Sequence, residues 1–447
     1  MILNVLENIS SYIWGLPTII LLIGTGIWLT IRLHMIQVFQ LKRALTLIFT
    51  SKGQGKGDIT PFKSLCTALA ATLGTGNIVG VATAIKMGGP GALFWMWIAA
   101  FIGMATKYAE CLLAVKYREI DANGNISGGP MYYIKNGMGP NFKWLATAFA
   151  FFGMIAGILG IGTMTHLNSI TEIVHLTLGF DKMLVGMIIS VLAGIIILKG
   201  LRSISTVSSS IVPVMALIYF VITIGVLIVN IDKIPGAIQT IFTSAFTTTA
   251  ATGGFVGSTI MLAMRSGIAR GIFSNESGLG SAPIVAAAAK TQYPAEQGLV
   301  SMTGTFIDTI IFCTLTGLCI VVTGAWIEPI NGAAMTNFAF TSVFSEWGGY
   351  FLMISLVLFA FSSIIGWCYY SERCSVYLFG VKGIIPFRLM YISAIVVASF
   401  LKLEEIWTIA DICNGLMALP NLIAILCLSK VVISETKCYL HASKSTK

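Results

Sequence analysis

Apolar residues dominate the chain in runs of about 20, which are separated by shorter polar segments carrying most of the charge. A run of this length can cross the hydrocarbon core of a bilayer as a helix. We count eleven such runs, and the pattern therefore predicts an all-α membrane protein with eleven transmembrane helices. The predicted spans are 16–33, 62–86, 91–114, 144–172, 182–199, 206–230, 237–264, 297–324, 347–371, 387–402 and 406–430.

Glycine-rich segments interrupt two of these runs, at residues 70–78 and 250–257. Hydrocarbon offers no partners for unpaired backbone groups, so an interrupted helix survives only where it lines a cavity or a binding site. Paired breaks in the two halves of a membrane chain are typical of the central site of a secondary transporter. A further glycine series in the fourth span is instead typical of close helix packing. It comprises Gly153, Gly157, Gly160 and Gly162.

Setting the first span aside leaves ten spans, and the breaks fall in the first and the sixth of these. This layout predicts an inverted repeat of five plus five helices, in which the two broken helices cross near the bilayer midplane. Half-helix N-termini can then point N–H groups at a substrate carboxylate, while unwound carbonyl groups face a cation. The expected organisation is an N-terminal helix with its loop (1–61), two repeat halves (62–236 and 237–432) and a tail (433–447).

Basic residues are distributed unevenly between alternate loops. The predicted outer loops hold only Lys86, Lys182, Lys233 and Lys402 of the 27 Lys and Arg residues. By the positive-inside rule, the N-terminus is outside and the C-terminus is cytoplasmic. The net charge of +9 then indicates topology and contact with anionic lipid, not nucleic-acid binding. We expect a multi-pass protein of the cytoplasmic membrane. The expected cytoplasmic segments are 34–61, 115–143, 199–205, 265–296, 372–388 and the tail after 430.

Composition excludes several other classes. Hydrophobic residues make up 56% of the chain and charged residues only 10%, far from the balance of soluble proteins. The nine cysteines form no C-x-x-C pair, and no phosphate-binding loop of ATPases is present, so neither a zinc site nor ATP-driven transport is indicated. The sequence shows no repeated selectivity-filter motif of the kind that a channel would need. It also shows no paired nucleophile and base of the kind that an intramembrane enzyme would need. We expect a carrier that is not an enzyme and uses no cofactor.

Several polar side chains within the spans are candidates for binding. An intramembrane carboxylate such as Asp308 is costly and indicates a cation ligand or a proton carrier, although it could also brace a helix break. Asn77, Ser362 and Ser363 supply oxygen atoms of the kind that hard cations prefer. The two serines could instead bond back to the preceding helical turn.

Two larger side chains and one segment complete the candidates. Trp367 lies about one turn beyond the serines and could form a wall of a substrate pocket. His166 belongs to a polar stripe of the fourth span, where it is either a pocket residue or a packing residue. The patterned segment 269–283 is read as a cytoplasmic loop that forms a gate network or anchors at the headgroups.

Several of these motifs resemble the alanine/glycine:cation symporter family across nearly the whole chain. The resemblance is carried by Gly74-Thr75-Gly76-Asn77-Ile78, Gly88-Gly89-Pro90-Gly91-Ala92, Phe94-Trp95-Met96-Trp97, Gly129-Pro130-Met131-Tyr132-Tyr133, the Arg270–Pro283 segment, Gln297-Gly298-Leu299-Val300 and Gly366-Trp367 followed by Glu372-Arg373. It implies sodium-coupled uptake of small neutral amino acids, mainly alanine and glycine, by a fold similar to that of the bacterial leucine transporter.

The resemblance also implies roles for individual residues. A sodium ion is expected between the carbonyl groups of Ala70 and Leu73 and the hydroxyl groups of Ser362 and Ser363, with Asp308 as a further candidate ligand. The amino acid is expected at the first bend, at the second break and at two walls of the pocket. These positions are Thr72, Gly74, Thr75, Gly76, Asn77, His166, Thr252, Gly254, Phe255 and Trp367.

One departure from the family pattern affects the substrate. The family usually has a glutamine in the fourth span where this chain has His166. The family's neighbouring asparagine is replaced by Thr163 in this chain. Glutamine or serine as the substrate, and proton coupling, therefore stay open beside alanine or glycine with sodium. The expected partners are a small neutral amino acid, sodium and lipid, and the sequence does not predict an oligomeric state.

Overall fold

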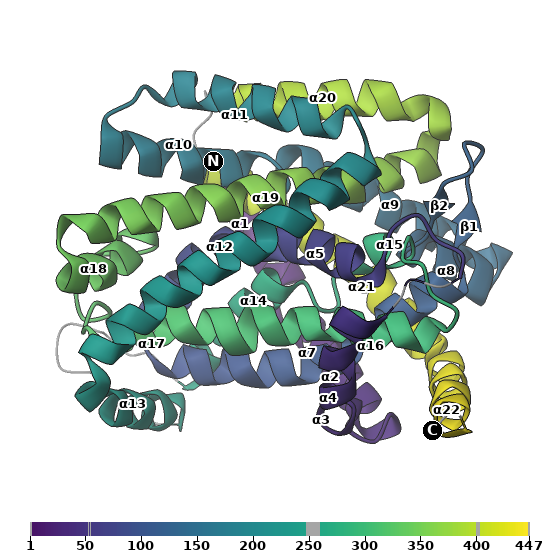
Figure 1. Ribbon diagram of the computed structural model, residues 1–447, viewed down its shortest axis with the longest axis horizontal. Helices are drawn as coiled ribbons and strands as arrows, with labels where there is room; N and C mark the ends of the chain where they lie inside the picture. The colour runs from purple at the N-terminus through teal and green to yellow at the C-terminus, as the bar shows by residue number, and fades with distance from the viewer. Residues whose placement is uncertain (1, 52, 54, 247–259, 399–402, 446–447) are drawn as a thin grey trace.

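The computed structural model describes residues 2–51, 53, 55–246, 260–398 and 403–445. Within these ranges the chain is helical apart from its connections and one antiparallel hairpin, β1 (Glu119–Ile120) and β2 (Ile126–Ser127) (Figure 1). The expectation of an all-α architecture is therefore confirmed in outline.

Six helical segments of the described ranges are long and apolar enough to cross a membrane, or eight if two bent pairs each count as one span. The six segments contain α7 (Gly91–Lys116), α9 (Lys143–Leu159) with α10 (Met164–Leu178), α12 (Leu201–Val229), α16 (Pro294–Thr305) with the π-helix η5 (Phe306–Cys313) and α17 (Thr314–Val322), α19 (Glu346–Phe379), and α20 (Ile384–Ala398). Several predicted spans, such as 91–114 and 206–230, match these helices closely, while the total of eleven stays a prediction.

Besides these and the broken helices described below, the described residues form further helices. They are α1 (Ile2–Ile13), α2 (Leu16–Arg32), α3 (Ile36–Phe39), α4 (Leu41–Thr50), α8 (Pro130–Tyr133), α11 (Lys182–Ile197), α13 (Ile234–Phe246), α18 (Ala333–Phe344), α21 (Leu403–Cys427) and α22 (Ser429–Ser445), with short turns η2 (Ile134–Met138), η3 (Pro140–Phe142), η4 (Ile231–Lys233) and η6 (Val381–Gly383).

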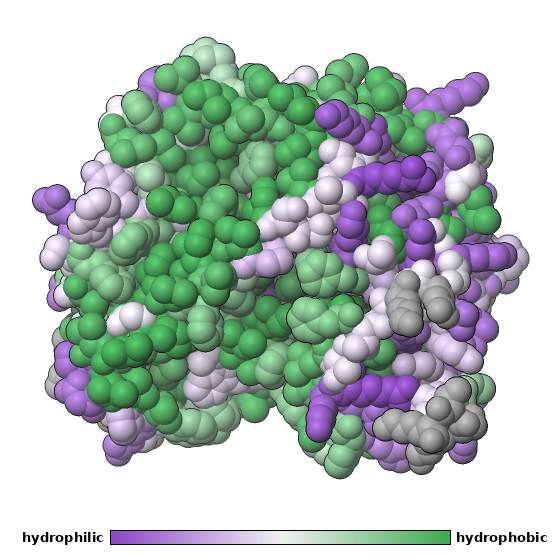
Figure 2. Space-filling model, in the orientation of Figure 1, coloured by the Kyte–Doolittle hydropathy of each residue, from purple (hydrophilic) through white to green (hydrophobic). Residues whose placement is uncertain are grey.

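Large apolar side chains are exposed along the outer helices. Val191 on α11 and Leu217 on α12 are each 63% exposed. Figure 2 shows hydrophobic side chains over much of the visible face, while hydrophilic ones gather toward the end that carries the hairpin and α22. An apolar surface of this extent is unfavourable in water and is suited to lipid.

The first predicted break is present. Thr60 caps α5 (Pro61–Thr72) by accepting a hydrogen bond from the backbone N–H of Lys63 (3.2 Å), and Pro61 occupies the first helical position, which favours it. The helix ends at Leu73, whose ψ of 92° is extended. The chain resumes as a π-helical turn, η1 (Gly76–Gly80), and then α6 (Val81–Gly88), bent by 53° from α5.

A second interruption separates α14 (Ile260–Asn275) from α15 (Ala282–Ala286). Three residues between them have positive φ: Glu276 (+56°), Gly278 (+86°) and Gly280 (+82°). The expected second break, at 250–257, lies outside the described residues. Residues 265–275, which the sequence placed in a loop, instead belong to the helix α14, and its glycines pack closely on α7: a Cβ atom added at Gly267 would lie 2.2 Å from the carbonyl oxygen of Ala92. The cytoplasmic side of segment 265–296 stays a prediction.

The fourth predicted span, 144–172, is also interrupted. Residues 160–163 leave the helical conformation between α9 and α10. The glycines that precede this interruption do pack closely, as expected: a Cβ atom at Gly157 would lie 1.6 Å from the Oγ of Ser371 on α19. Gly160 and Gly162 instead belong to the interruption, where Tyr391 donates a hydrogen bond to the carbonyl oxygen of Gly162 (2.7 Å).

Candidate functional site

The two interrupted helices run antiparallel, and their breaks meet. A Cβ atom added at Gly88, the end of α6, would lie 2.8 Å from the Cα of Ala263, near the start of α14. At the other end of the pair, a Cβ atom at Gly76 would lie 3.1 Å from the Cα of Ser274. The bend at 73–76 therefore faces the last turn of α14. Both N-termini and C-termini of half-helices converge here, so backbone donors and acceptors are close together.

Asp308 is the centre of a polar cluster at this junction. It is fully buried in η5, and its carboxylate accepts hydrogen bonds from Asn77 Nδ2 (2.8 Å), Ser274 Oγ (2.9 Å) and Thr309 Oγ1 (2.7 Å). The carboxylate thus joins both breaks to η5 through three neutral donors, and the buried cation Lys107 of α7 acts on it electrostatically. A buried charge in this position is costly unless a cation accompanies it.

Asn77 also closes the first bend. Its Oδ1 accepts the backbone N–H of Gly74 (3.0 Å), while its Nδ2 contacts Asp308. One side chain therefore shapes the bend and connects it to the carboxylate. The nearby Thr72 hydroxyl donates to the Ala68 carbonyl oxygen of its own helix (3.2 Å), which places this predicted site residue in the helix end itself.

The two predicted serines of α19 lie against the end of α5. Ser362 Oγ is 3.1 Å from the carbonyl oxygen of Ala70, and a Cβ atom at Gly74 would lie 2.6 Å from Ser363 Oγ. Both hydroxyls also reach the carbonyl oxygen of Phe359, one turn earlier in α19 (2.9 and 3.1 Å). The structure thus places Ser362 and Ser363 against Ala70 and Gly74, and Leu73, which precedes Gly74, is buried as well.

His166 faces the first bend from the start of α10. Its Nδ1 is 3.3 Å from Thr75 Oγ1, and its Cε1 would lie 3.0 Å from a Cβ atom at Gly74. The side chain is buried, with 2% of its surface exposed. The interruption at 160–163 sets the register of this contact, because α10 begins only at Met164.

Trp367 lies at the second break and is buried, with 1% of its surface exposed. Its Nε1 donates to Glu276 Oε1 (2.8 Å), and Ser281 hydrogen-bonds the other carboxylate oxygen. Glu276, at a strained positive φ, is therefore held at both oxygens. The sequence analysis singled out segment 269–283, which contains Glu276, but no sequence pattern predicts that Glu276 contacts Trp367.

A second carboxylate holds the same break from α7. Glu110 Oε1 accepts the backbone N–H of Gly278 (2.6 Å) and Asn421 Nδ2 (3.0 Å). Lys107, one turn earlier on α7 and 3% exposed, interacts electrostatically with Glu110 and Glu276. Sequence reasoning missed this group, since Lys107 and Glu110 lie near the polar end of a predicted span and resemble its flanking charges.

A cavity of about 270 Å³ adjoins the first bend on the side away from α5. Thr75 and Gly76 line it from the first bend, and Arg270 and Phe273 line it from α14. The other lining residues are Val79, Gly80, Thr83, Asn168, Ser169, Glu172, Ile173, Leu176, Ala333 and Leu356. The predicted substrate residues Thr252, Gly254 and Phe255 lie outside the described residues.

Comparison with known proteins identifies the family of the chain. The whole chain, residues 1–447, matches the sodium:alanine symporter family. It is 54% identical over 443 residues to an uncharacterized transporter of Haemophilus influenzae, covering 99% of this chain and 97% of that one. It is 47% identical over 451 residues to the sodium/alanine symporter AgcS of Methanococcus maripaludis, covering 99% and 98%.

The chain is also similar, at lower identity, to a relative named for a different amino acid and to a solved structure. The chain is 37% identical to the probable sodium/glutamine symporter GlnT of Bacillus subtilis, covering 99% of this chain and 93% of that one. The crystal structure of MhsT in complex with L-phenylalanine superimposes with a TM-score of 0.57 at 14% identity, covering 86% and 93%, and this likeness indicates the fold alone. Because the family match spans all 447 residues, the chain belongs to the sodium:alanine symporter family, a family of transporters and not of enzymes.

Proposed function

We propose that this protein couples sodium entry to the uptake of a small neutral amino acid, alanine or glycine first, by alternating access across the cytoplasmic membrane. The observation that carries the proposal is the junction of the two breaks around Asp308, beside a cavity lined by Thr75 and Gly76. Membership of the family and the 47% identity to AgcS support the ion and the class of substrate.

The amino acid would bind with its carboxylate at the bend 74–77. The N-terminus of η1 begins there, and the first N–H groups of a helix have no partners within the helix and attract anions. Its ammonium group would face the C-terminal carbonyl groups of α14. His166 and Thr75 lie beside this place and would contact the small side chain. Thr252, Gly254 and Phe255 stay predicted contacts.

Sodium would bind between α5 and α19. The Ala70 carbonyl oxygen already accepts a hydrogen bond from Ser362, and rotation of that hydroxyl would turn both oxygens toward an ion. Leu73 and Ser363 would complete the site with oxygens of the type that hard cations prefer. Asp308 would balance the charge of a cation that binds closer to the carboxylate of the amino acid than the site between α5 and α19. Asn77, Ser274 and Thr309 are the neighbours of Asp308 there.

The transmembrane layout belongs to the same proposal. Antiparallel broken helices are what an inverted five-plus-five repeat produces, and eleven spans with the N-terminus outside fit the distribution of basic residues. In this proposal α14 and α15 form the sixth of the ten repeat helices, which the sequence analysis placed at 237–264. The apolar outer surface would contact lipid, with the basic loops at the cytoplasmic headgroups.

Uptake into proteoliposomes tests the proposal. An inward sodium gradient should drive concentrative, saturable uptake of labelled alanine, and replacing sodium by potassium should abolish it. Competition by unlabelled glycine, serine and glutamine would separate the substrate alternatives, and a proton gradient without sodium would test proton coupling. Uptake that is linear in substrate and never exceeds the external concentration would favour a channel instead.

A further inference from the structure

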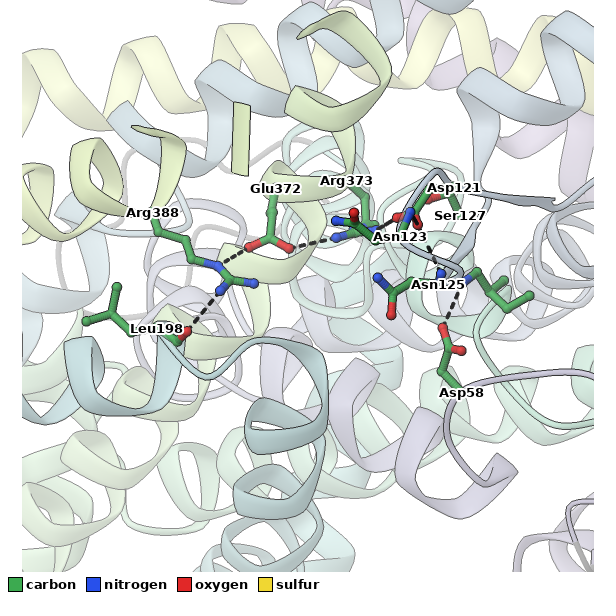
Figure 3. Close-up of polar contacts among 10 residues, drawn as sticks. Asp58, Asp121, Asn123, Asn125, Ser127, Leu198, Glu372, Arg373 and Arg388 are labelled. Carbon is green, nitrogen blue, oxygen red and sulfur yellow. Dashed lines mark hydrogen bonds and ion pairs between the residues drawn. The ribbon is translucent and has the colours of Figure 1, made fainter. Parts of the chain in front are cut away.

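A chain of buried ion pairs crosses the end of the molecule that carries the β1–β2 hairpin, here called the hairpin end (Figure 3). Arg373 of α19 contacts Asp121 in the hairpin (3.0 Å) and Glu372 (2.8 Å), and Glu372 contacts Arg388 of α20 (2.6 Å). These side chains are at most 11% exposed. Arg388 also donates to the Leu198 carbonyl oxygen beyond the end of α11 (2.9 Å). The hairpin is thus tied to α19, α20 and α11.

Asp121 has two tasks in this chain. Its Oδ1 accepts the backbone N–H groups of Asn123 (2.9 Å) and Asn125 (3.0 Å), which folds the turn between the strands. Its Oδ2 is left for Arg373. The turn and the ion pair therefore depend on different oxygens of one carboxylate and can be separated by substitution.

The opposite side of the hairpin is bound to the two broken helices. Arg118 donates to the carbonyl oxygens of Ala287, Ala289 and Lys56, each at 2.8 Å. Asp58 Oδ2 accepts the backbone N–H of Ile126 (2.8 Å). Residues 287–289 follow α15 and residues 56–58 precede α5, so these contacts hold the half-helices that lie on the hairpin side of the breaks.

The hairpin consequently ties together two groups of helices, which also pack directly on each other where α19 contacts α5 and α15. One group is α5 with α15, which are also linked by a parallel bridge between Ile59 and Ala289. The other is α19 with α20 and α11. The Asp121–Arg373 pair lies between the groups, and the cavity lies beyond the breaks, along η1 and α6 toward Thr83. The cavity beside the site and the fastened hairpin therefore lie on opposite sides of the breaks.

We propose that the hairpin 119–127 is a strap that closes the hairpin end, and that separation of Asp121 from Arg373 releases it when the site opens to that side. The proposal rests on the alternating access proposed above. A buried ion pair suits a latch, because the desolvation of its two charges offsets much of their attraction, and opening returns both charges to water. Arg118 keeps the hairpin attached to α5 and α15 throughout.

Cysteine labelling tests the strap independently of transport. Cys66 lies in α5 between the bridge at Ile59 and the break, and is 3% exposed. In a background with the other eight cysteines replaced by serine, labelling of Cys66 by a membrane-impermeant maleimide is followed in inside-out vesicles without sodium or amino acid. Asp121→Asn keeps the turn-forming oxygen and removes the charge, and it should raise the labelling rate at least about ten-fold.

Glu119→Gln is the matched control. Glu119 lies in the same hairpin and pairs with Lys135 (2.9 Å), but the two side chains are 37% and 39% exposed. Exposed pairs contribute little, so the Cys66 labelling rate should stay within about two-fold of the parent. Arg373→Gln should match Asp121→Asn, while Arg373→Lys, which keeps the charge, should label more slowly than Arg373→Gln.

Unchanged labelling of Cys66 in both Asp121→Asn and Arg373→Gln, with elution and thermal unfolding like the parent, overturns the strap. Equally fast labelling in Glu119→Gln overturns the role of the specific pair. Fast labelling in the two pair variants, with no sodium-dependent uptake in the parent, would uphold the strap while refuting the proposed function.

Discussion

Replacing Asp308 by asparagine should weaken sodium activation far more than amino-acid recognition. The carboxylate accepts three hydrogen bonds at 2.7–2.9 Å, all from neutral groups, and is fully buried. A unit charge about 4 Å from a cation contributes up to about 4 kcal/mol at an effective dielectric constant near 20. An amide oxygen and rearranged hydroxyls recover part of this, which leaves a loss of about 1.4–2.7 kcal/mol, or about 10–100-fold in sodium affinity.

The assay is initial alanine uptake in proteoliposomes against sodium concentration. Asp308→Asn should raise the half-saturating sodium concentration about 10–100-fold, while the KM for alanine at saturating sodium changes less than about three-fold. Asp232→Asn is the control, since Asp232 is exposed in the short turn η4. A half-saturating sodium concentration within two-fold of the parent, combined with a lowered yield of folded protein, would assign Asp308 to structure and refute this reasoning.

Three further substitutions address the remaining parts of the site. Removing both hydroxyls in Ser362→Ala with Ser363→Ala should lower sodium affinity at least about ten-fold, because water replaces such ligands poorly in a buried site; an unchanged sodium dependence of uptake would exclude this site. Gly76→Val should abolish transport without loss of membrane insertion, because even its Cβ would lie 3.1 Å from the Ser274 backbone, whereas Gly80→Ala, with open space at its Cβ, should transport normally. If Gly76→Val transports normally, the contact between the breaks is not needed. His166→Gln should change the ranking of alanine, glycine, serine and glutamine as substrates, because the ring contacts Thr75 at the bend; an unchanged ranking would make His166 a packing residue.

The first break was predictable because its signals are local. Gly74, Gly76 and Asn77 mark a bend within an apolar run. The long continuous helices α7, α12 and α19 were predictable for the same reason, since hydropathy alone sets their length.

The second interruption was not recognised because its polar residues are satisfied by distant ones. In the sequence Glu276 resembles a charged loop residue. In the structure it accepts a hydrogen bond from Trp367, 91 residues later in the chain. Glu110 likewise reads as the polar end of a span, but it holds the N–H of Gly278, 168 residues away. Arg265 and Arg270 also interrupt the apolar pattern, so the predicted span ended at residue 264. Tertiary pairing of this kind leaves no periodic signal in the sequence.

Reciprocal binding to the purified protein tests the central claim most directly, namely that sodium and the amino acid share the junction of the two breaks. The dissociation constant of alanine is measured with and without sodium, and that of sodium with and without alanine. Thermodynamic linkage requires both affinities to change by the same factor, and direct sharing of the junction predicts a factor of about ten or more. An alanine affinity that is the same in sodium and in potassium would contradict the account.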